Sequence, residues 1–280
     1  MSLQTISEWL RCPNCFLPLV PKDPLSLTCG AGHSFDVNKR GYTTMLSGPR
    51  KFIGDSTTML DARDRFQAAG WYEPLQKAII QTISLERALA AKRILDVGCG
   101  TGYYLRAILQ ELPITAQALG MDLSPVAVAR TVRASNAVDG LVADVWSPLP
   151  IRDASADIVL NVFAPRNAPE FHRVLRANGL LLVVVPHPTH LQELRAAGLA
   201  LNIQPDKAGT LADGLANRFT LEAQQSLAFD LTLSPADVAD LIGMGPSSHH
   251  TDGTAITESD GARGVTAAFD ILSFRRRKSV

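Results

Sequence analysis

The feature that most constrains the fold is a glycine-rich turn directly after the short apolar segment Arg93–Val97. The turn reads Gly98-Cys-Gly100-Thr-Gly102 and leads into a stretch with helical spacing of apolar residues. A strand that enters a helix through such a turn is typical of a parallel α/β sheet, whose backbone closely approaches a ligand there. The third glycine is spaced differently from that of the dinucleotide fingerprint, and no Lys-Ser/Thr pair follows, which excludes a phosphate-binding P-loop.

Three acidic residues are placed where a nucleoside ligand with an amino-acid tail needs them. Asp96 is available to the ammonium group, Asp122 ends the second predicted strand where an acid accepts hydrogen bonds from the ribose, and Asp144 follows the third, beside the adenine. With alternating strands and helices, this predicts an α/β fold: a class I, Rossmann-like methyltransferase sheet that binds S-adenosylmethionine. An NAD-binding domain is the alternative. The turn contacts to the cofactor are expected from Gly98, Gly100, Thr101 and Gly102.

A cluster of cysteines near the N-terminus indicates a metal site. Cys12 and Cys15 are two residues apart in the spacing of a knuckle, and Cys29 and His33 form a second turn across two glycines. Three thiolates and one imidazole form a closed tetrahedral site that suits structural Zn²⁺. We therefore predict a small N-terminal zinc-binding domain, with core cysteines and an incidental histidine as the alternative.

The chain divides by pattern into three parts: a zinc-binding domain at 1–50, linker helices at 51–89 and the methyltransferase domain at 90–280. Asp55 is placed to cap a helix through Ala69, and a second helix is expected to reach Leu89. Later elements are predicted as a helix at 167–177, a strand at 180–185, a strand at 218–233, a helix at 235–242, a polar loop at 245–263 and a strand at 265–275. The last two strands resemble the antiparallel pair that closes a class I sheet.

The composition limits how the protein could bind RNA and where it is expected to act. Lysine plus arginine and aspartate plus glutamate both number 27, so the formal net charge is zero and any RNA binding must use a local patch and shape. No apolar run is long enough to span a bilayer, and the N-terminus lacks the pattern of a signal peptide. We expect a cytoplasmic protein with no membrane association, and leave a homodimer open.

Nearly end to end, the sequence resembles the RlmA family of 23S rRNA guanine-N1 methyltransferases, because it combines the knuckle with the glycine turn. Further matching motifs are His33-Ser-Phe-Asp36, Gly70-Trp-Tyr72-Glu-Pro-Leu75, Ala164-Pro165 and His190-Leu-Gln-Glu-Leu194. Three stretches look like the Gram-positive branch, which includes the tylosin-resistance enzyme: Ala143–Trp146, Asn161–Asn167 and Met244–Ser248. Trp71, where relatives often carry histidine, and the pair His249 and His250 depart from the pattern.

The resemblance implies zinc on Cys12, Cys15, Cys29 and His33, and S-adenosylmethionine contacts from Tyr72, the glycine turn and His190. It also implies a guanine in a domain II hairpin of 23S rRNA as the methyl acceptor, and a link to antibiotic resistance. Asn161 and His190 are the candidate catalytic residues, since both lie after late strands at the carboxyl edge of the predicted sheet. A small-molecule methyltransferase with a structural zinc cap is the alternative, and a ribosome-binding factor with a vestigial cofactor site is a third.

Overall fold

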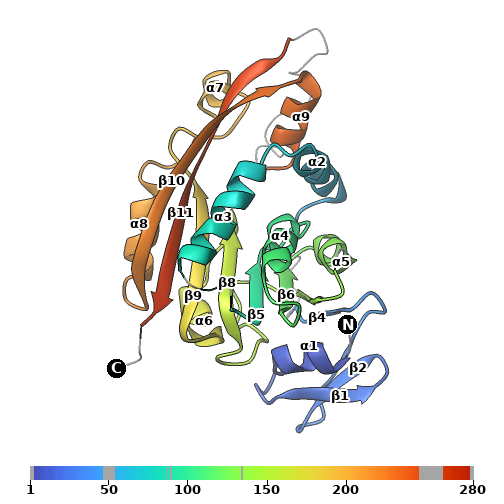
Figure 1. The fold of residues 1–280 in the computed structure, drawn as a ribbon. Helices are drawn as coiled ribbons and strands as arrows, with labels where there is room; N and C mark the ends of the chain where they lie inside the picture. Colours follow the sequence, from blue (N-terminus) through green and yellow to red (C-terminus); the bar gives the residue numbers. More distant parts are fainter. Residues whose placement is uncertain are drawn as a thin grey trace.

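The computed structural model describes residues 3–46, 54–86, 88, 90–133, 135–245 and 261–277. Within these residues, eight strands form one sheet in the order β10-β11-β9-β8-β5-β6-β7-β4 (Figure 1). The strands from β9 to β4 are parallel, and β11 and β10 close the sheet in antiparallel pairing. The bounds are β4 Tyr42–Thr44, β5 Arg93–Val97, β6 Gln117–Asp122, β7 Val138–Val142, β8 Ala156–Val162, β9 Leu175–Pro186, β10 Phe219–Leu233 and β11 Arg263–Arg276.

The central strands are apolar along their length because helices cover both faces of the sheet. One face packs against α1, α6 and α8, and the other against α2, α3, α4, α7 and α9. Their bounds are α1 Leu3–Trp9, α2 Thr57–Ala68, α3 Glu73–Leu85, α4 Tyr103–Glu111, α5 Pro125–Arg133, α6 Ala168–Val174, α7 Gln192–Ala196, α8 Lys207–Leu215 and α9 Pro235–Gly243. The predicted Rossmann-like methyltransferase architecture is confirmed. In the described part of the chain, no helix has the length and apolar character that a membrane span requires.

The N-terminal segment folds as a small three-stranded sheet, β1 Leu19–Asp23, β2 Ser26–Cys29 and β3 Ser34–Asp36, against α1. It shares one hydrophobic core with the large sheet, in which Trp9 and Leu27 lie with Leu95. Backbone carbonyls of the segment also accept hydrogen bonds from Arg152, at 2.9 Å for Leu10 and 2.8 Å for Leu19. The segment then supplies β4 to the edge of the large sheet. The knuckle is therefore docked firmly on the main domain.

Two predicted helix ends differ from the structure. The cap of α2 is Ser56, whose hydroxyl accepts from Met59 N at 3.2 Å, and not Asp55. Asp55 instead forms an ion pair with Arg63 at 2.6 Å, and this tertiary contact takes the carboxylate away from the helix end. The helix predicted to reach Leu89 ends at Leu85.

The later elements were predicted closely, with one shift. The helix expected at 167–177 is α6 and ends at Val174, because Leu175 already pairs with Ala156 of β8. The strand expected at 180–185 therefore begins at Leu175. The predicted C-terminal strand, helix and strand correspond to β10, α9 and β11. Residues 47–53 lie outside the described residues, at the junction of the predicted zinc-binding domain and linker helices. Most of the polar loop at 245–263, with Pro246–Ser248 and the pair His249 and His250, also lies outside them.

Candidate functional site

The four residues of the knuckle converge on one centre. Their sulfur and imidazole nitrogen atoms all lie within 4.8 Å of one another. Cys15 Sγ is 3.6 Å from Cys29 Sγ, and His33 Nδ1 is 3.4 Å from Cys29 Sγ and 3.5 Å from Cys12 Sγ. A tetrahedral Zn²⁺ with bonds of about 2.0–2.3 Å needs ligand atoms that are about 3.3–3.8 Å from one another. The donor set therefore fits Zn²⁺ and, with four protein ligands, suits a structural role.

Two short turns bring these ligands together. The Phe16 N–H donates to Cys12 O at 2.9 Å, which closes the first turn. The Gly32 N–H donates to Cys29 O at 2.9 Å in the second, where Gly32 has a φ of 83°. A positive φ is readily adopted by glycine, which explains its place directly before His33.

The glycine-rich turn has the backbone form that its sequence predicts. Gly98, Gly100 and Gly102 have φ values of 81°, 53° and 75°. A Cβ on Gly98 would lie only 2.3 Å from the Cβ of Ala164, in the segment after β8. At Gly98, glycine is therefore required both by the conformation and by the close approach of a second loop.

Asp96, at the end of β5, is a buried carboxylic acid with 4% exposure. Burial, and then the nearby charge of Asp122, raises its pKa to about 8. No described residue donates a hydrogen bond to its side chain. A buried ionised carboxylate without a partner is costly, so this position is suited to a cationic group brought in by a ligand.

Asp122 lies at the end of β6, next to the turn. One oxygen accepts from Gly100 N at 3.0 Å and the other from Ser124 N at 2.9 Å. A carboxylate offers about four acceptor positions. Asp122 therefore fixes the turn and retains acceptor capacity for two hydroxyl groups.

Asp144 follows β7 and organises a tight turn. Its carboxylate accepts from Trp146 N at 3.0 Å and from Ser147 Oγ at 3.1 Å. The turn presents the Trp146 side chain to solvent, with 68% of the residue exposed.

Asn161, at the end of β8, is fully buried. Its amide nitrogen donates to Val97 O at 3.2 Å and to Pro165 O at 3.0 Å, while Oδ1 has no partner among the described residues. These bonds join the end of β5 to the segment that packs on Gly98. The amide donors of Asn161, a candidate catalytic residue from the sequence, are thus engaged in holding the site together.

Tyr72 and His190, predicted from distant parts of the chain, meet at one aromatic ring. The centroid of Phe269 lies 5.2 Å from that of Tyr72 and 4.7 Å from that of His190. The Ala268 N–H donates to His190 Nδ1 at 3.1 Å, so the ring proton is on Nε2. Burial, and then the charge of Arg195, lowers the pKa of His190 to about 3, so the imidazole is neutral at physiological pH.

The motif that begins with His190 is fastened to β11 by Glu193. Its carboxylate accepts from the backbone N–H and the hydroxyl of Thr266, both at 2.8 Å. The Leu191 N–H donates to Thr266 O at 2.8 Å, and Leu194 is buried beneath. Glu193 thus positions the imidazole without facing the site.

Sequence reasoning missed two residues of α2 that contact the turn. Arg63 reaches over Gly100, so that a Cβ there would be 3.0 Å from the guanidinium. Gln67 Oε1 accepts from the Thr101 hydroxyl at 2.7 Å. The two residues are four apart on the buried side of the predicted helix. The sequence signal that could have identified them is the presence of polar residues on the otherwise apolar, buried face of this helix.

Comparison with known proteins matches this geometry to a family. The Methyltransferase domain family matches residues 94–179. A putative 23S rRNA (guanine-N(1)-)-methyltransferase of Micromonospora griseorubida is 38% identical, over 95% of this chain and 97% of its own. The 23S rRNA (guanine(748)-N(1))-methyltransferase of Streptomyces fradiae is 40% identical, over 89% of each chain.

The chain belongs to the 23S rRNA guanine-N1 methyltransferase family. Among solved structures, the YcgJ protein of Bacillus subtilis shares the fold, with a TM-score of 0.50 at 15% identity, over 73% of this chain and 98% of that one.

The cofactor that this methyltransferase uses is S-adenosylmethionine, and the residues present fit it. Asp96 is an acid without a hydrogen-bond partner among the described residues, and it is suited to the ammonium group. Asp122 can accept from two ribose hydroxyls, and Arg63 suits a carboxylate at Gly100. The donor and acceptor types therefore agree with both ends of the cofactor.

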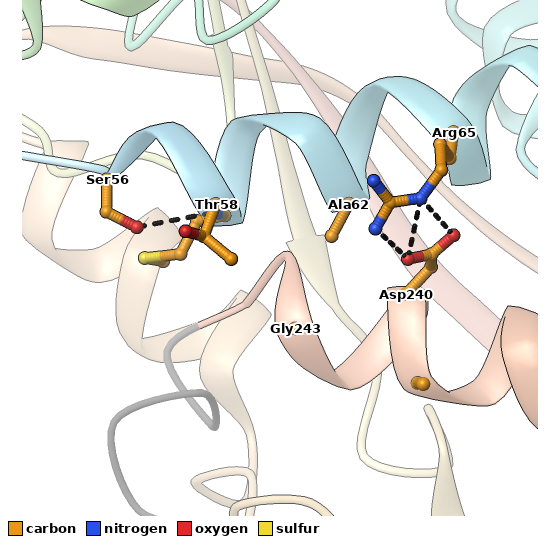
Figure 2. Close-up of a pocket in the computed structure, with 8 residues that line it drawn as sticks. Ser56, Thr58, Ala62, Arg65, Asp240 and Gly243 are labelled. Atoms are coloured by element: carbon orange, nitrogen blue, oxygen red, sulfur yellow. Dashed lines mark hydrogen bonds and ion pairs between the residues drawn. The ribbon is translucent and has the colours of Figure 1, made fainter. Parts of the chain in front are cut away.

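The methyltransferase also has a surface groove between α2 and α9, with a volume of about 380 Å³. Figure 2 shows the ion pair of Arg65 and Asp240 at one end and the Ser56 cap at the other. Trp71 contacts the same helix α9, because its Nε1–H donates to Asp237 Oδ1 at 3.0 Å. Trp71, which departs from the family pattern, thus anchors α9 to the start of α3.

Proposed function

We propose that this chain transfers a methyl group from S-adenosylmethionine to N1 of a guanine in 23S rRNA. The observation that carries the proposal is the near full-length similarity to two proteins named as 23S rRNA guanine-N1 methyltransferases. The arrangement of Asp96 and Asp122 around the glycine turn supports the choice of methyl donor. A small-molecule acceptor has no comparable support along the N-terminal segment.

We assign the cofactor contacts as follows. Asp96 receives the ammonium group, Asp122 the ribose hydroxyls and Asp144 the edge of the adenine. Arg63 is added as the partner of the carboxylate. Tyr72, Gly98, Gly100, Thr101, Gly102 and His190 complete the set.

The cofactor supplies an activated methyl group on its sulfonium, so the chain's main contribution is to position the acceptor. His190 is assigned as a hydrogen-bond donor through Nε2, because its low pKa makes it a poor base. Asn161 is assigned a positioning role, holding the segment 163–165 against Gly98. We infer that the N1 proton leaves to solvent late in the reaction.

The acceptor atom lies on the Watson–Crick edge, so the guanine must be unpaired or flipped out. Trp146 and Phe163 are exposed at the carboxyl ends of β7 and β8, at 68% and 44%. Exposed aromatic rings suit stacking on unpaired bases. We propose a guanine in a domain II hairpin as the target, as the resemblance implies, and place the enzyme in the cytoplasm, where ribosomes are assembled. A homodimer and a link to macrolide resistance stay predictions.

Primer extension on 23S rRNA from a deletion strain tests the proposal. Methylation at N1 blocks base pairing and stops the polymerase, so the native strain should give a stop that the deletion strain lacks. Complementation with the native gene should restore the stop, and the Asp96→Asn variant should not. An identical pattern in both strains would exclude the proposed reaction and favour a small-molecule acceptor.

A further inference from the structure

Among the residues that the structure describes, Arg166 and Lys207 form a pair of cations without a counter-ion. Arg166 lies in the segment after β8, and Lys207 is the first residue of α8, which packs along β9 and β10 (Figure 1). Both are half-buried and line one surface pocket of about 270 Å³. Two like charges brought together in a partly desolvated pocket are unfavourable without an anion.

The electrostatics of the pair support this description. Burial lowers the pKa of Arg166, and burial and then Arg166 lower the pKa of Lys207. No acidic residue of the described chain offsets either cation. By contrast, Arg173 is paired with Asp153 and Glu170, both at 2.6 Å. Asp206, the neighbour of Lys207, uses its carboxylate to cap α8 through Gly209 N at 3.1 Å.

The other described residues of the pocket wall add donors and no acids. Gln204 and Thr210 supply an amide and a hydroxyl, and the floor is apolar, formed by Ala168, Leu211 and Leu215. The Arg166 guanidinium donates to Ala164 O at 3.2 Å, which fixes its orientation. Such a set of donors, with one planar cation held in place, suits an oxyanion.

The pocket adjoins the methyl-transfer edge of the sheet. Ala164 packs on Gly98, and the Asn167 amide donates to Val145 O at 2.7 Å, which ties this segment to the exposed Trp146. A phosphate bound by Arg166 would therefore lie beside the place where an acceptor base enters.

We propose that Arg166 and Lys207 bind a backbone phosphate of the substrate RNA close to the target guanine. The proposal rests on the proposed function. A chain with zero net charge needs such a local contact, since phosphate neutralisation supplies much of RNA affinity. The site fixes the register of the strand and leaves base recognition to other residues.

The first test measures binding of a domain II hairpin fragment by fluorescence anisotropy, in the presence of S-adenosylhomocysteine and over a range of salt. Arg166→Gln and Lys207→Gln should each weaken binding roughly tenfold. Each should also lower the slope of log K against log salt by about 0.7–0.9. Arg166→Lys should retain most of the slope. The matched control is Lys77→Gln, an exposed lysine paired with Glu73 on α3, which should change neither quantity.

A second test separates a specific contact from general attraction. A series of hairpins is prepared, each with one uncharged methylphosphonate at a different position near the target guanine. The native protein should bind more weakly to the hairpin in which the contacted phosphate has been replaced. The Arg166→Gln variant should bind that hairpin and the unmodified hairpin with equal affinity. Calorimetry with S-adenosylhomocysteine should give native affinity for both variants, which shows that the fold and the cofactor site are intact.

Equal affinity and salt slope in the native protein and both glutamine variants would overturn the proposal, as would failure of the native protein to bind the hairpin. If the native enzyme still gives the primer-extension stop, the proposed function stands and only the phosphate site fails. Binding of inorganic phosphate with no effect of the variants on RNA would also count against an RNA site.

Discussion

Two features of the structure disfavour a Cβ atom at position 98, where the chain has Gly98. Its φ of 81° disfavours any Cβ, and a Cβ would meet that of Ala164 at 2.3 Å. Gly98→Ala should therefore reduce cofactor affinity beyond detection and destabilise the protein by more than the roughly 1 kcal/mol expected for φ alone. Gly70→Ala is the matched control, since Gly70 has a φ of 82° and no neighbouring atom of the described residues lies within 4 Å of its added Cβ. Urea unfolding and calorimetry measure both effects, and equal losses in the two variants would contradict the close approach.

Asp96 gives a pH-dependent prediction for the ligand-free protein. Its pKa is about 8 when folded, against a normal value near 3.8 in the unfolded chain. Because the folded value is raised, the stability associated with the protonated acid is complete below about pH 4 and is lost as pH rises towards 8. Asp96→Asn removes this loss. The variant should gain on the order of 2 kcal/mol over the native protein between pH 6 and pH 8.

Denaturant unfolding at both pH values, with zinc bound, measures that difference. The same variant should fail to bind S-adenosylhomocysteine, because the ammonium group loses its acidic partner. A stability difference that does not change with pH would mean that the carboxylate is already ionised at pH 6.

Arg63 is predicted to bind the carboxylate of the methyl donor. Arg63→Gln should weaken the binding of S-adenosylhomocysteine roughly tenfold, which is the loss expected for one charge-assisted hydrogen bond. Methylthioadenosine has the same nucleoside without the amino-acid tail, so its affinity should be unchanged in this variant. Asp122→Asn should weaken both ligands. Equal losses of both ligands in Arg63→Gln would indicate a merely structural role for its pair with Asp55.

At the scale of elements, the zinc knuckle is a structural support for the sheet. Its buried Cys12 and Cys29 belong to the core that also contains Leu95 of β5 and Leu141 of β7. Removal of the metal by a strong chelator should therefore lower the melting temperature of the whole protein. Metal analysis should find one zinc per chain. A chain that contains no zinc, or that melts unchanged after chelation, would contradict this support.

The types of the helices and strands were predictable where the sequence pattern was long and periodic. They were less predictable where a tertiary contact determines the start of an element. The strand–helix–strand order from β10 to β11 was visible in the sequence. The start of α2 was misplaced by one residue, because Asp55 and Ser56 are both capable caps and only the fold directs Asp55 to Arg63. The strand β4 has three residues, too short for a periodic signal, and it pairs with β7 almost a hundred residues later.

At the scale of the whole molecule, the sites of metal and cofactor binding were predicted from spacing because their ligands are local in sequence. Cys12 to His33 and Asp96 to Gly102 are of this kind. The pocket of Arg166 and Lys207 was not predicted, since its two cations are 41 positions apart in the chain. Arg166 lies in the family-like stretch Asn161–Asn167, but nothing in the sequence links it to Lys207. Arg63 was missed for the same reason, as only packing of α2 on the turn gives it a role.

The central claim is that this chain methylates N1 of a guanine in 23S rRNA. Purified enzyme with zinc bound, S-adenosylmethionine and 23S rRNA from a strain that lacks the activity provide the direct measurement, followed by nuclease digestion and mass spectrometry. The account predicts close to one new 1-methylguanosine per rRNA molecule, and none with Asp96→Asn. Methyl transfer to another atom or base, or no transfer to RNA at all, would contradict it.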